Sequence, residues 1–305
     1  MHRVAWILVA VVGCSSSSSE ESTEPTTDSA VAIEAGSEGG TDAVADTAVA
    51  DTAIAPDAVS DTVTDGAAPT WWAPAPGTSW QWQLSGTLDT SFDVKVYDID
   101  LFGTTTAQID ALHAAKRKVV CYLDTAYEPG RPDSDKLAPY KGNAVKGWPG
   151  QFWLDIRQPA VVAVMKDRIA LAQTKHCDAI EADDVDSRAN DPGFPITAAD
   201  QQGFIRTLAK EAHARGLGYA LKNDLEEIGA LLADVDFAVN EECFAFDECD
   251  LLKPFIAAGK AVFQVEYTDG TLATKGATIC PKANALNFDT LIKHLDLDPP
   301  RYACR

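Results

Sequence analysis

Two acidic stretches, CDAIEADDVD (177–186) and VNEECF (239–244), say most about the fold. Each begins as a short apolar run of the kind that forms a buried strand. Each then becomes rich in carboxylates where that strand should end. In a parallel barrel the C-terminal ends of the strands meet at one mouth. If both stretches are strands of such a barrel, their carboxyl groups converge there.

Strand parity predicts which acids of the first stretch point inward. Side chains alternate along a strand, so Ile180 and Ala182 share one face, and Glu181 and Asp183 share the other. The apolar face suits the layer under the helices. We therefore expect Glu181 and Asp183 to face the barrel interior, with Asp183 nearer the mouth and Asp186 on the rim.

Parity leaves the second stretch open. Glu241 alternates with Phe237 and Val239, whereas Glu242 shares a face with Asn240. Either face is a plausible inward face. The sequence alone does not choose between Glu241 and Glu242.

Strand-like runs alternate with helical runs from Trp71 onward. The expected strands are 79–84, 92–100, 118–124, 177–183, 217–223, 236–242 and 260–267, with a last unit within 276–295. The expected helices are 104–118, 159–175, 198–216, 224–233 and 246–259. This pattern predicts an α/β fold, a (β/α)₈ TIM barrel, as a single domain over residues 71–305. A doubly wound sheet is the alternative, but the chain has no GxGxxG motif or phosphate loop.

A long segment, residues 125–157, separates the third strand from the next helix. Loops of this length are usually functional or disordered. Its aromatic residues favour an ordered lid; they are Tyr127, Tyr140, Trp148, Phe152 and Trp153. We expect ion pairs of Arg131 with Asp133 and of Asp155 with Arg157 to hold the segment in one conformation.

The first 14 residues resemble a bacterial lipoprotein signal peptide. The apolar core at 4–12 is too short to span a bilayer, and VVGC (11–14) resembles a lipobox. The resemblance implies cleavage before Cys14 and lipid attachment to its thiol; an ordinary signal peptide is the alternative. Ser15 favours the outer membrane over inner-membrane retention. We therefore expect an exported chain, anchored at the outer membrane or cell surface through Cys14.

Residues 15–70 are expected to form a disordered acidic linker because they are of low complexity. They contain twelve acids and no Lys or Arg. Residues 71–305 therefore hold 34 acids and 24 bases, which is about −10 of the −21 formal charge of the whole chain. Nucleic acid is excluded as a partner because phosphate binding requires clustered cations. A cationic ligand would be attracted, although acidity also serves solubility alone.

Six cysteines follow Cys14, and an even number in an exported chain predicts disulfides. The expected pairs are Cys121 with Cys177, Cys243 with Cys249, and Cys280 with Cys304. A zinc site is the rival interpretation, but there is no CxxC pair and the five histidines are scattered. We expect no metal and no other cofactor.

Polar residues end several of the predicted strands. A single acid of this kind often caps the next helix or pairs with a cation. A whole ring is harder to explain that way, because buried polar groups are costly unless they bind something or one another. The expected ring is Asp98, Asp100, Asp183, Lys222, Asn223, Glu241 and Glu266. Two carboxyl groups at one mouth form the catalytic pair with which most glycoside hydrolases cleave a glycosidic bond.

A series of motifs along the chain resembles a known family. The motifs are WQWQL (80–84), VYDIDLF (96–102), VVCYLDTAYEPGRPD (119–133), FWLDIR (152–157), CDAIEADDVD (177–186), GFPIT (193–197), LKND (221–224), NEECF (240–244) and VFQVEY (262–267). In order and approximate spacing they are similar to glycoside hydrolase family 114, the bacterial and fungal endo-α-1,4-polygalactosaminidases. The resemblance spans about residues 71–275. It implies a TIM-barrel hydrolase acting on α-1,4-linked galactosamine polymers.

The resemblance also implies roles for the two acidic stretches. The family's catalytic pair, an Asp ending the fourth strand and a Glu ending the sixth, corresponds to Asp183 and Glu241. Asp184 with Glu242 is the competing register, and strand parity favours Asp183. A retaining mechanism is implied, with Asp183 as nucleophile and Glu241 as acid and then base. Such a pair is about 5–5.5 Å apart, against about 6.5–9.5 Å in inverting enzymes.

Other family matches are candidates for sugar contacts or for positioning the pair. They are Asp98, Tyr122, Arg131, Glu181, Asp186, Lys222, Asn223, Glu266 and Tyr267. Four tryptophans are expected either to stack on sugar rings or to fill the core, namely Trp80, Trp82, Trp148 and Trp153. The expected partner is a cationic polysaccharide bound by a monomer. The alternative function is a non-catalytic polysaccharide-binding surface lipoprotein on the same fold.

Overall fold

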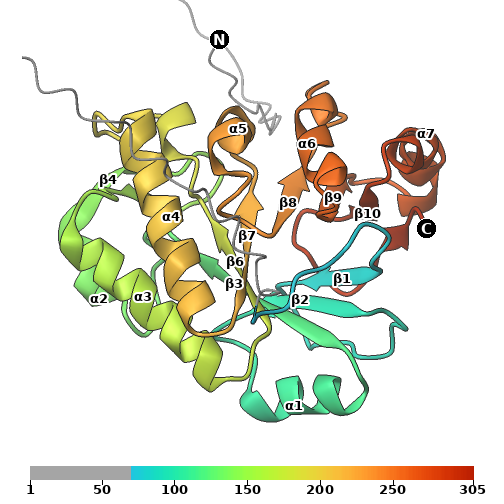
Figure 1. Cartoon of the computed structure of the whole chain (residues 1–305), viewed down its shortest axis with the longest axis horizontal. Coiled ribbons are helices and arrows are strands. Elements are labelled where there is room, and N and C mark those ends of the chain that lie inside the picture. The colour runs from blue at the N-terminus through green and yellow to red at the C-terminus, as the bar shows by residue number, and fades with distance from the viewer. Residues whose placement is uncertain (1–69) are drawn as a thin grey trace, which may run out of the picture. The chain divides into compact units, whose positions relative to one another are not determined.

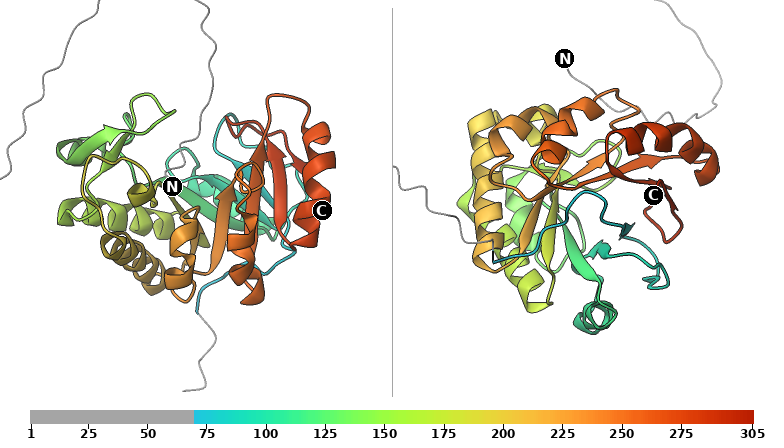
Figure 2. Two further views of the ribbon diagram at one scale, coloured as in Figure 1. Left: turned by 90° about the horizontal axis from the view of Figure 1, so that it is seen from above. Right: turned by 45° about the vertical axis from the view of Figure 1, so that its right-hand side comes forward.

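The computed structural model describes residues 70–305; the predicted signal peptide, Cys14 and the linker lie outside this range. Eight parallel strands form one curled sheet (Figures 1 and 2). In sheet order they are β1 (Trp80–Gln83), β2 (Val96–Asp100), β3 (Lys118–Asp124), β6 (Ala179–Asp183), β7 (Gly218–Lys222), β8 (Phe237–Glu241), β9 (Val262–Tyr267) and β10 (Asp289–Lys293). A short β11 (Tyr302–Ala303) pairs antiparallel with β10. The predicted TIM-barrel-like α/β fold is confirmed.

Helices lie on the outside of the curled sheet (Figure 1). They are α1 (Thr106–Ala114), α3 (Pro159–Thr174), α4 (Ala198–Ala214), α5 (Ile228–Leu231), α6 (Lys253–Ala257) and α7 (Leu272–Ala285). Short 3₁₀ turns precede α4, α5 and α6, namely η2 (Ser187–Ala189), η3 (Leu225–Glu227) and η4 (Cys249–Leu252). Thr105 and Thr197 begin α1 and α4 with reciprocal capping boxes. Helix α1 is shorter than the predicted 104–118, because Lys116 adopts a left-handed φ of 61° just after it.

The core has two layers on either side of the strands. Ile180 and Ala182 pack outward with the apolar faces of the helices. Ala179, Phe237 and Val239 pack inward, in the layer that fills the lower barrel. The predicted inward face of β6 is thereby confirmed. Apolar residues fill the lower interior, so the polar residues of the same faces gather at the C-terminal end.

The barrel has a seam between β1 and β10. Within residues 70–305 no strand ladder joins these two strands, and the C-terminal segment bridges them instead. Trp80 Nε1 donates to the Asp289 carbonyl at 2.7 Å, Gln81 Nε2 donates to the Pro299 carbonyl at 2.7 Å, and Arg301 donates to the Trp80 carbonyl. The structure therefore assigns Trp80 to the core, and it does the same for the buried Trp82 and Trp153.

All three predicted disulfides are present. They join Cys121 to Cys177, Cys243 to Cys249, and Cys280 to Cys304. The first links β3 to the residue two before β6, and the last fastens the C-terminal tail to α7. Disulfides stabilise mainly by restricting the unfolded chain, and they are typical of exported proteins.

The segment 125–157 is ordered. It contains α2 (Ser134–Leu137), η1 (Ala138–Tyr140) and a two-stranded sheet of β4 (Lys141–Ala144) and β5 (Phe152–Leu154). The Lys141 ammonium lies 4.5 Å from the Tyr127 ring centroid and 4.7 Å from that of Phe152. These contacts favour one conformation of the segment.

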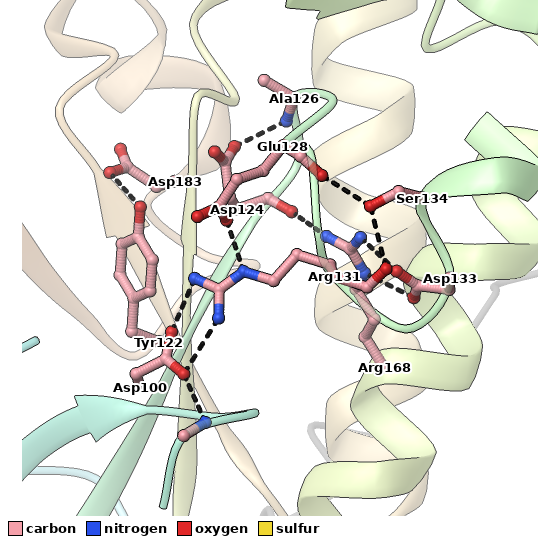
Figure 3. Close-up of polar contacts among 11 residues, drawn as sticks. Asp100, Tyr122, Asp124, Ala126, Glu128, Arg131, Asp133, Ser134, Arg168 and Asp183 are labelled. Carbon is pink, nitrogen blue, oxygen red and sulfur yellow. Dashed lines mark hydrogen bonds and ion pairs between the residues drawn. The ribbon is translucent and has the colours of Figure 1, made fainter. Parts of the chain in front are cut away.

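One expected ion pair of this segment is wrong. Arg131 binds Asp100 and Glu128, and Asp133 instead binds Arg168, which is 1% exposed and reaches it from α3 (Figure 3). The other pair, Asp155 with Arg157, is present at 2.7 Å. Within residues 70–305, none of the helices has the length and apolar character needed to cross a membrane.

Candidate active site

Lys222 is the centre of the polar cluster at the C-terminal mouth. Its Nζ lies 2.8 Å from Asp183 Oδ1, 3.1 Å from Glu241 Oε2 and 3.6 Å from Glu181 Oε1. The side chain is 1% exposed. Burial by itself lowers the pKa of Lys222, but the carboxylates of Asp183, Glu241 and Glu181 outweigh it and raise that pKa well above its usual value. Lys222 is therefore a permanent buried cation.

Asp183 ends β6 and points into the mouth. Its carboxylate accepts a hydrogen bond from Tyr122 Oη at 3.0 Å (Figure 3). It also accepts from the Lys222 ammonium at 2.8 Å and from the Asp184 amide at 2.9 Å. The side chain is 22% exposed. Three donors fix its orientation while one side stays open to solvent.

Glu241 ends β8 and approaches Lys222 from the other side. Tyr267 Oη donates to its Oε1, and Asn223 Nδ2 donates to its Oε2 at 3.2 Å. Asn223 Oδ1 in turn accepts the Glu241 amide at 2.9 Å. The side chain is 27% exposed. Asp183 and Glu241 are thus held alike, each by the same lysine and by a tyrosine hydroxyl.

A left-handed residue follows each of these strands. Asp184, Asn223 and Glu242 have φ values of 56°, 49° and 58°. Asp and Asn tolerate this region, but Glu rarely adopts it, and such strain gathers at functional sites. Each strand therefore turns directly after the carboxylate that binds Lys222, Asp183 on β6 and Glu241 on β8.

The acids of the competing register have other surroundings. Burial and then the neighbouring Asp124 raise the pKa of Asp184 well above its usual value, as expected for two carboxyl groups that share a proton. Burial and then Glu266 raise the pKa of Glu242. No ion pair joins Asp184 or Glu242 to a described Lys or Arg.

A second carboxyl pair lies below Lys222. Asp98 and Glu181 are both 0% exposed, and within residues 70–305 their carboxyl groups contact only one another and, for Glu181, the Lys222 ammonium at 3.6 Å. Burial raises the pKa of Asp98 to about 7, and burial followed by Asp98 raises that of Glu181 well above its usual value. The two groups therefore share at least one proton at neutral pH.

The nine predicted contact residues fall into two groups. Four are at most 1% exposed beneath the mouth, namely Asp98, Glu181, Lys222 and Glu266. Five are partly exposed around it, namely Tyr122, Arg131, Asp186, Asn223 and Tyr267. Glu266 accepts the Phe244 amide and the Gln264 carboxamide, both at 2.9 Å. The first group supports the site from below, and only the second can meet a sugar directly.

Asp186 differs from the other carboxylates at the mouth. Within the described chain no side chain donates a hydrogen bond to its carboxylate. Burial and then the charge of Asp183 raise the pKa of Asp186 to about 6. This carboxylate remains available to a cation brought by a ligand.

Sequence reasoning missed Asp124 and the position of Trp82. Asp124 ends β3 and accepts the Ala126 amide at 2.6 Å, so the strand-end pattern that singled out Asp183 applies to it equally. The Trp82 ring centroid lies 5.1 Å from Lys222 Nζ, a cation–π contact that no local motif predicts.

One group of described residues has the composition of a metal site. The ligand atoms of His294, Asp296 and Asp298 lie within 4.8 Å of one another, after the end of β10. Exposed acidic groups of this kind are common without an ion. The geometry alone assigns no metal to them.

Comparison with known proteins agrees with this geometry. A model of glycoside-hydrolase family GH114 matches residues 60–305. No curated protein matches the chain. Among solved structures, Ega3 from Aspergillus fumigatus in complex with galactosamine is 38% identical, covers 76% of this chain and 97% of its own, and has a TM-score of 0.73.

The glycoside hydrolase domain of PelA from Pseudomonas aeruginosa is a more distant match. It is 14% identical, covers 74% of this chain and 97% of its own, and has a TM-score of 0.58. A variant of the same domain gives the same values. At this identity the likeness concerns the fold alone.

Proposed function

Because this chain belongs to glycoside hydrolase family GH114, we propose that it hydrolyses α-1,4-linked galactosamine polymers with Asp183 and Glu241 as the catalytic pair. The chain is a glycoside hydrolase; the substrate, the pair and the mechanism are the proposal. The observation that carries it is the Lys222 ammonium shared by these two partly exposed carboxylates.

The shared lysine limits the distance between the two carboxylates. Asp183 Oδ1 and Glu241 Oε2 lie 2.8 and 3.1 Å from one Nζ, so these oxygens are separated by no more than the sum of the two distances, 5.9 Å. Retaining glycosidases have carboxyl groups about 5–5.5 Å apart, and inverting enzymes need about 6.5–9.5 Å to admit a water. The geometry favours retention.

The proposed reaction has two displacements. Asp183, oriented by Tyr122 and Lys222, attacks the anomeric carbon while Glu241 gives its proton to the departing glycosidic oxygen. Glu241 then takes a proton from water, which displaces Asp183 and releases the sugar with its original anomeric configuration. Glu241 enters the first step protonated, and Asp183 is an ester between the two steps; Lys222 lies between the two groups and contacts no substrate.

The charge of the site supports a cationic substrate. Asp183, Glu241 and Asp186 surround the mouth, whereas Lys222 is the cation that binds the first two of them. A polymer with free amines carries positive charge at neutral pH. The Ega3 structure contains galactosamine, which agrees with this chemistry. We assign Asp186 to the substrate amine because its carboxylate has no side-chain donor of its own among the described residues.

The test is release of reducing ends from a partly deacetylated galactosamine polymer, followed by NMR of the first anomer formed. The α anomer is expected first. Initial release of the β anomer would reject retention while leaving hydrolysis intact. Binding of the polymer without any cleavage would favour the binding-protein alternative.

The lipid anchor at Cys14 remains a proposal. The three disulfides suggest export, and the lipobox-like VVGC precedes the predicted linker. A Cys14→Ser chain expressed in a bacterium should leave the membrane fraction but keep its activity. Retention of this variant in the membrane fraction would refute anchoring through Cys14.

A further inference from the structure

We propose that a cavity beside the catalytic pair is a second sugar-binding subsite, which holds a neighbouring galactosamine unit of the polymer. The inference rests on the proposed function. The cavity has a volume of about 300 Å³, near the lower end of the range for small-ligand sites. It lies between the loop after β1, the end of β2 and the start of α1, and it is lined by Gln83, Ser85, Thr87, Asp100, Thr104 and Gln108 among others.

The cavity opens at the same end of the barrel as the catalytic pair. The eight barrel strands are parallel, and the cavity is built on the C-terminal ends of β1 and β2. Asp100 in its wall is the register partner of Tyr122 on β3, and neighbouring strands lie about 4.8 Å apart. Tyr122 Oη donates to Asp183 at 3.0 Å (Figure 3). The cavity wall is thus one strand away from the residue that orients the proposed nucleophile.

Asp100, in the wall of the cavity, is held by several contacts. Arg131 binds both carboxylate oxygens of Asp100, at 3.0 and 2.8 Å, and also binds Glu128 on the opposite side (Figure 3). Asp100 Oδ1 additionally accepts the Gly103 amide at 2.5 Å. Because Arg131 is shared by two carboxylates, this partly exposed cluster carries one excess negative charge, which suits a cationic sugar.

The outer rim is also held in place. No helix follows β1; residues 84–95 form a loop instead. The Gln83 side chain, 4% exposed, donates to the Ser85 and Thr87 carbonyls at 3.0 and 2.8 Å and accepts the Asp89 amide at 3.0 Å. The buried Gln83 carboxamide therefore fixes the conformation of the loop that surrounds the cavity.

The chemistry of the lining fits a sugar. The hydroxyls of Ser85, Thr87 and Thr104 and the amide of Gln108 match the hydroxyl groups of a hexosamine ring. The remaining lone pairs of Asp100 can accept from an ammonium or a hydroxyl group. A preformed polar cavity next to the reacting centre fits a polymer substrate better than a single sugar.

The test fills the cavity with Thr87→Trp and uses Thr90→Trp as the matched control. Both threonines are exposed in the same loop, but Thr90 does not line the cavity. KM for long galactosamine oligomers should rise about tenfold in Thr87→Trp, as for loss of about 1.4 kcal/mol of binding. Cleavage of the shortest oligomer that is hydrolysed should stay unchanged, and Thr90→Trp should behave as wild type.

A second arm makes the result independent of catalysis. Calorimetric titration of galactosamine oligomers into Asp183→Asn chains, with and without Thr87→Trp, should show the same loss for long oligomers only. Ser85→Trp replaces Thr87→Trp if thermal unfolding shows that the latter does not fold. Equal KM, product pattern and affinity at every oligomer length would overturn the subsite. A wild-type chain that binds the oligomers in this way without cleaving them would refute the proposed function alone.

Discussion

Two carboxyl pairs lie on opposite sides of the Lys222 ammonium, and their surroundings differ. Asp183 and Glu241 lie above it, are 22% and 27% exposed, and accept hydrogen bonds from tyrosine hydroxyls. Asp98 and Glu181 lie below it and are 0% exposed, and no other described residue donates a hydrogen bond to their carboxyl oxygens. Glu181 and Asp183 are only two residues apart on β6, so exposure and available donors decide what each carboxyl can do.

The difference separates chemistry from support. The upper pair can reach a substrate, and its donors stabilise fixed carboxylate orientations. The lower pair is fully buried and has no route to substrate, and burial raises both of its pKa values, so it binds protons more readily than an exposed carboxyl group does. We therefore expect substitutions above Lys222 to abolish turnover and substitutions below it to change stability.

The largest effect is expected in the upper pair. Asp183→Asn and Glu241→Gln should each lower kcat by roughly 10²- to 10⁴-fold, as for loss of a catalytic acid, base or nucleophile. The matched controls are Asp184→Asn and Glu242→Gln, the next residues along the chain. Initial rates on the polymer measure the effect. A greater loss in either control than in its neighbour would move the catalytic pair to the competing register.

Removal of the shared cation should have the next largest effect. Lys222→Met should lower kcat about 10²-fold, in the range for loss of one preorganised electrostatic contact, with a smaller change in KM. The acidic limb of the pH–rate profile should move to higher pH, because a carboxylate without its cation binds a proton more readily. Removing one partner of a buried ion pair also costs about 3–5 kcal/mol of folding stability.

Lys293→Met is the control for this prediction. Like Lys222, Lys293 is buried at the end of its strand, but its Nζ binds the Asp298 carbonyl at 2.6 Å and no carboxylate of the upper pair. The variant should lose stability and keep both kcat and the pH profile. If both lysine variants show unshifted profiles, Lys222 has only a structural role.

The lower pair should report mainly on stability. Burial raises the pKa of Asp98 to about 7, above its value in the unfolded chain near 3.9, so its contribution is present below about pH 4 and is lost as pH rises through about 7. Asp98→Asn should remove this contribution and flatten the fall in free energy of unfolding between pH 4 and 7. Denaturant unfolding at several pH values measures it. Turnover should fall less than about tenfold; a loss as large as in Asp183→Asn would cancel the distinction between the two pairs.

The smallest effect is expected at Asp186, the upper carboxylate without a side-chain donor. Asp186→Asn should raise KM for the deacetylated polymer several-fold and leave KM for a highly acetylated one unchanged. In the wild type this preference should weaken as pH falls through about 6, because the pKa of Asp186 is about 6 and only the ionised form attracts an amine. An equal KM change on both polymers would exclude recognition of the amine.

Sequence reasoning was most successful where local patterns are strong. Seven barrel strands and helices α1, α3 and α4 follow from hydrophobic periodicity, and the three disulfides follow from the positions of the cysteines along that order. The last unit was placed only within 276–295, and the helix α7 was not predicted. Short elements were less predictable, since α5 and α6 are single turns preceded by 3₁₀ segments. Arg131 was assigned to the nearer Asp133, whereas its partner Asp100 is 31 residues away.

The strand order, the acids at the strand ends and the family could all be predicted, because local spacing along the chain encodes each of them. Strand parity did not choose between Glu241 and Glu242, although the family resemblance pointed to Glu241; the tertiary structure brings Glu241 to Lys222 beside Asp183. Both faces of β8 are buried, the inner one by Phe237 and Val239 and the outer one by Ala238, so hydrophobic pattern could not tell them apart. Register between neighbouring strands and the left-handed turn at Glu242 settle the choice, and both depend on contacts between distant parts of the chain.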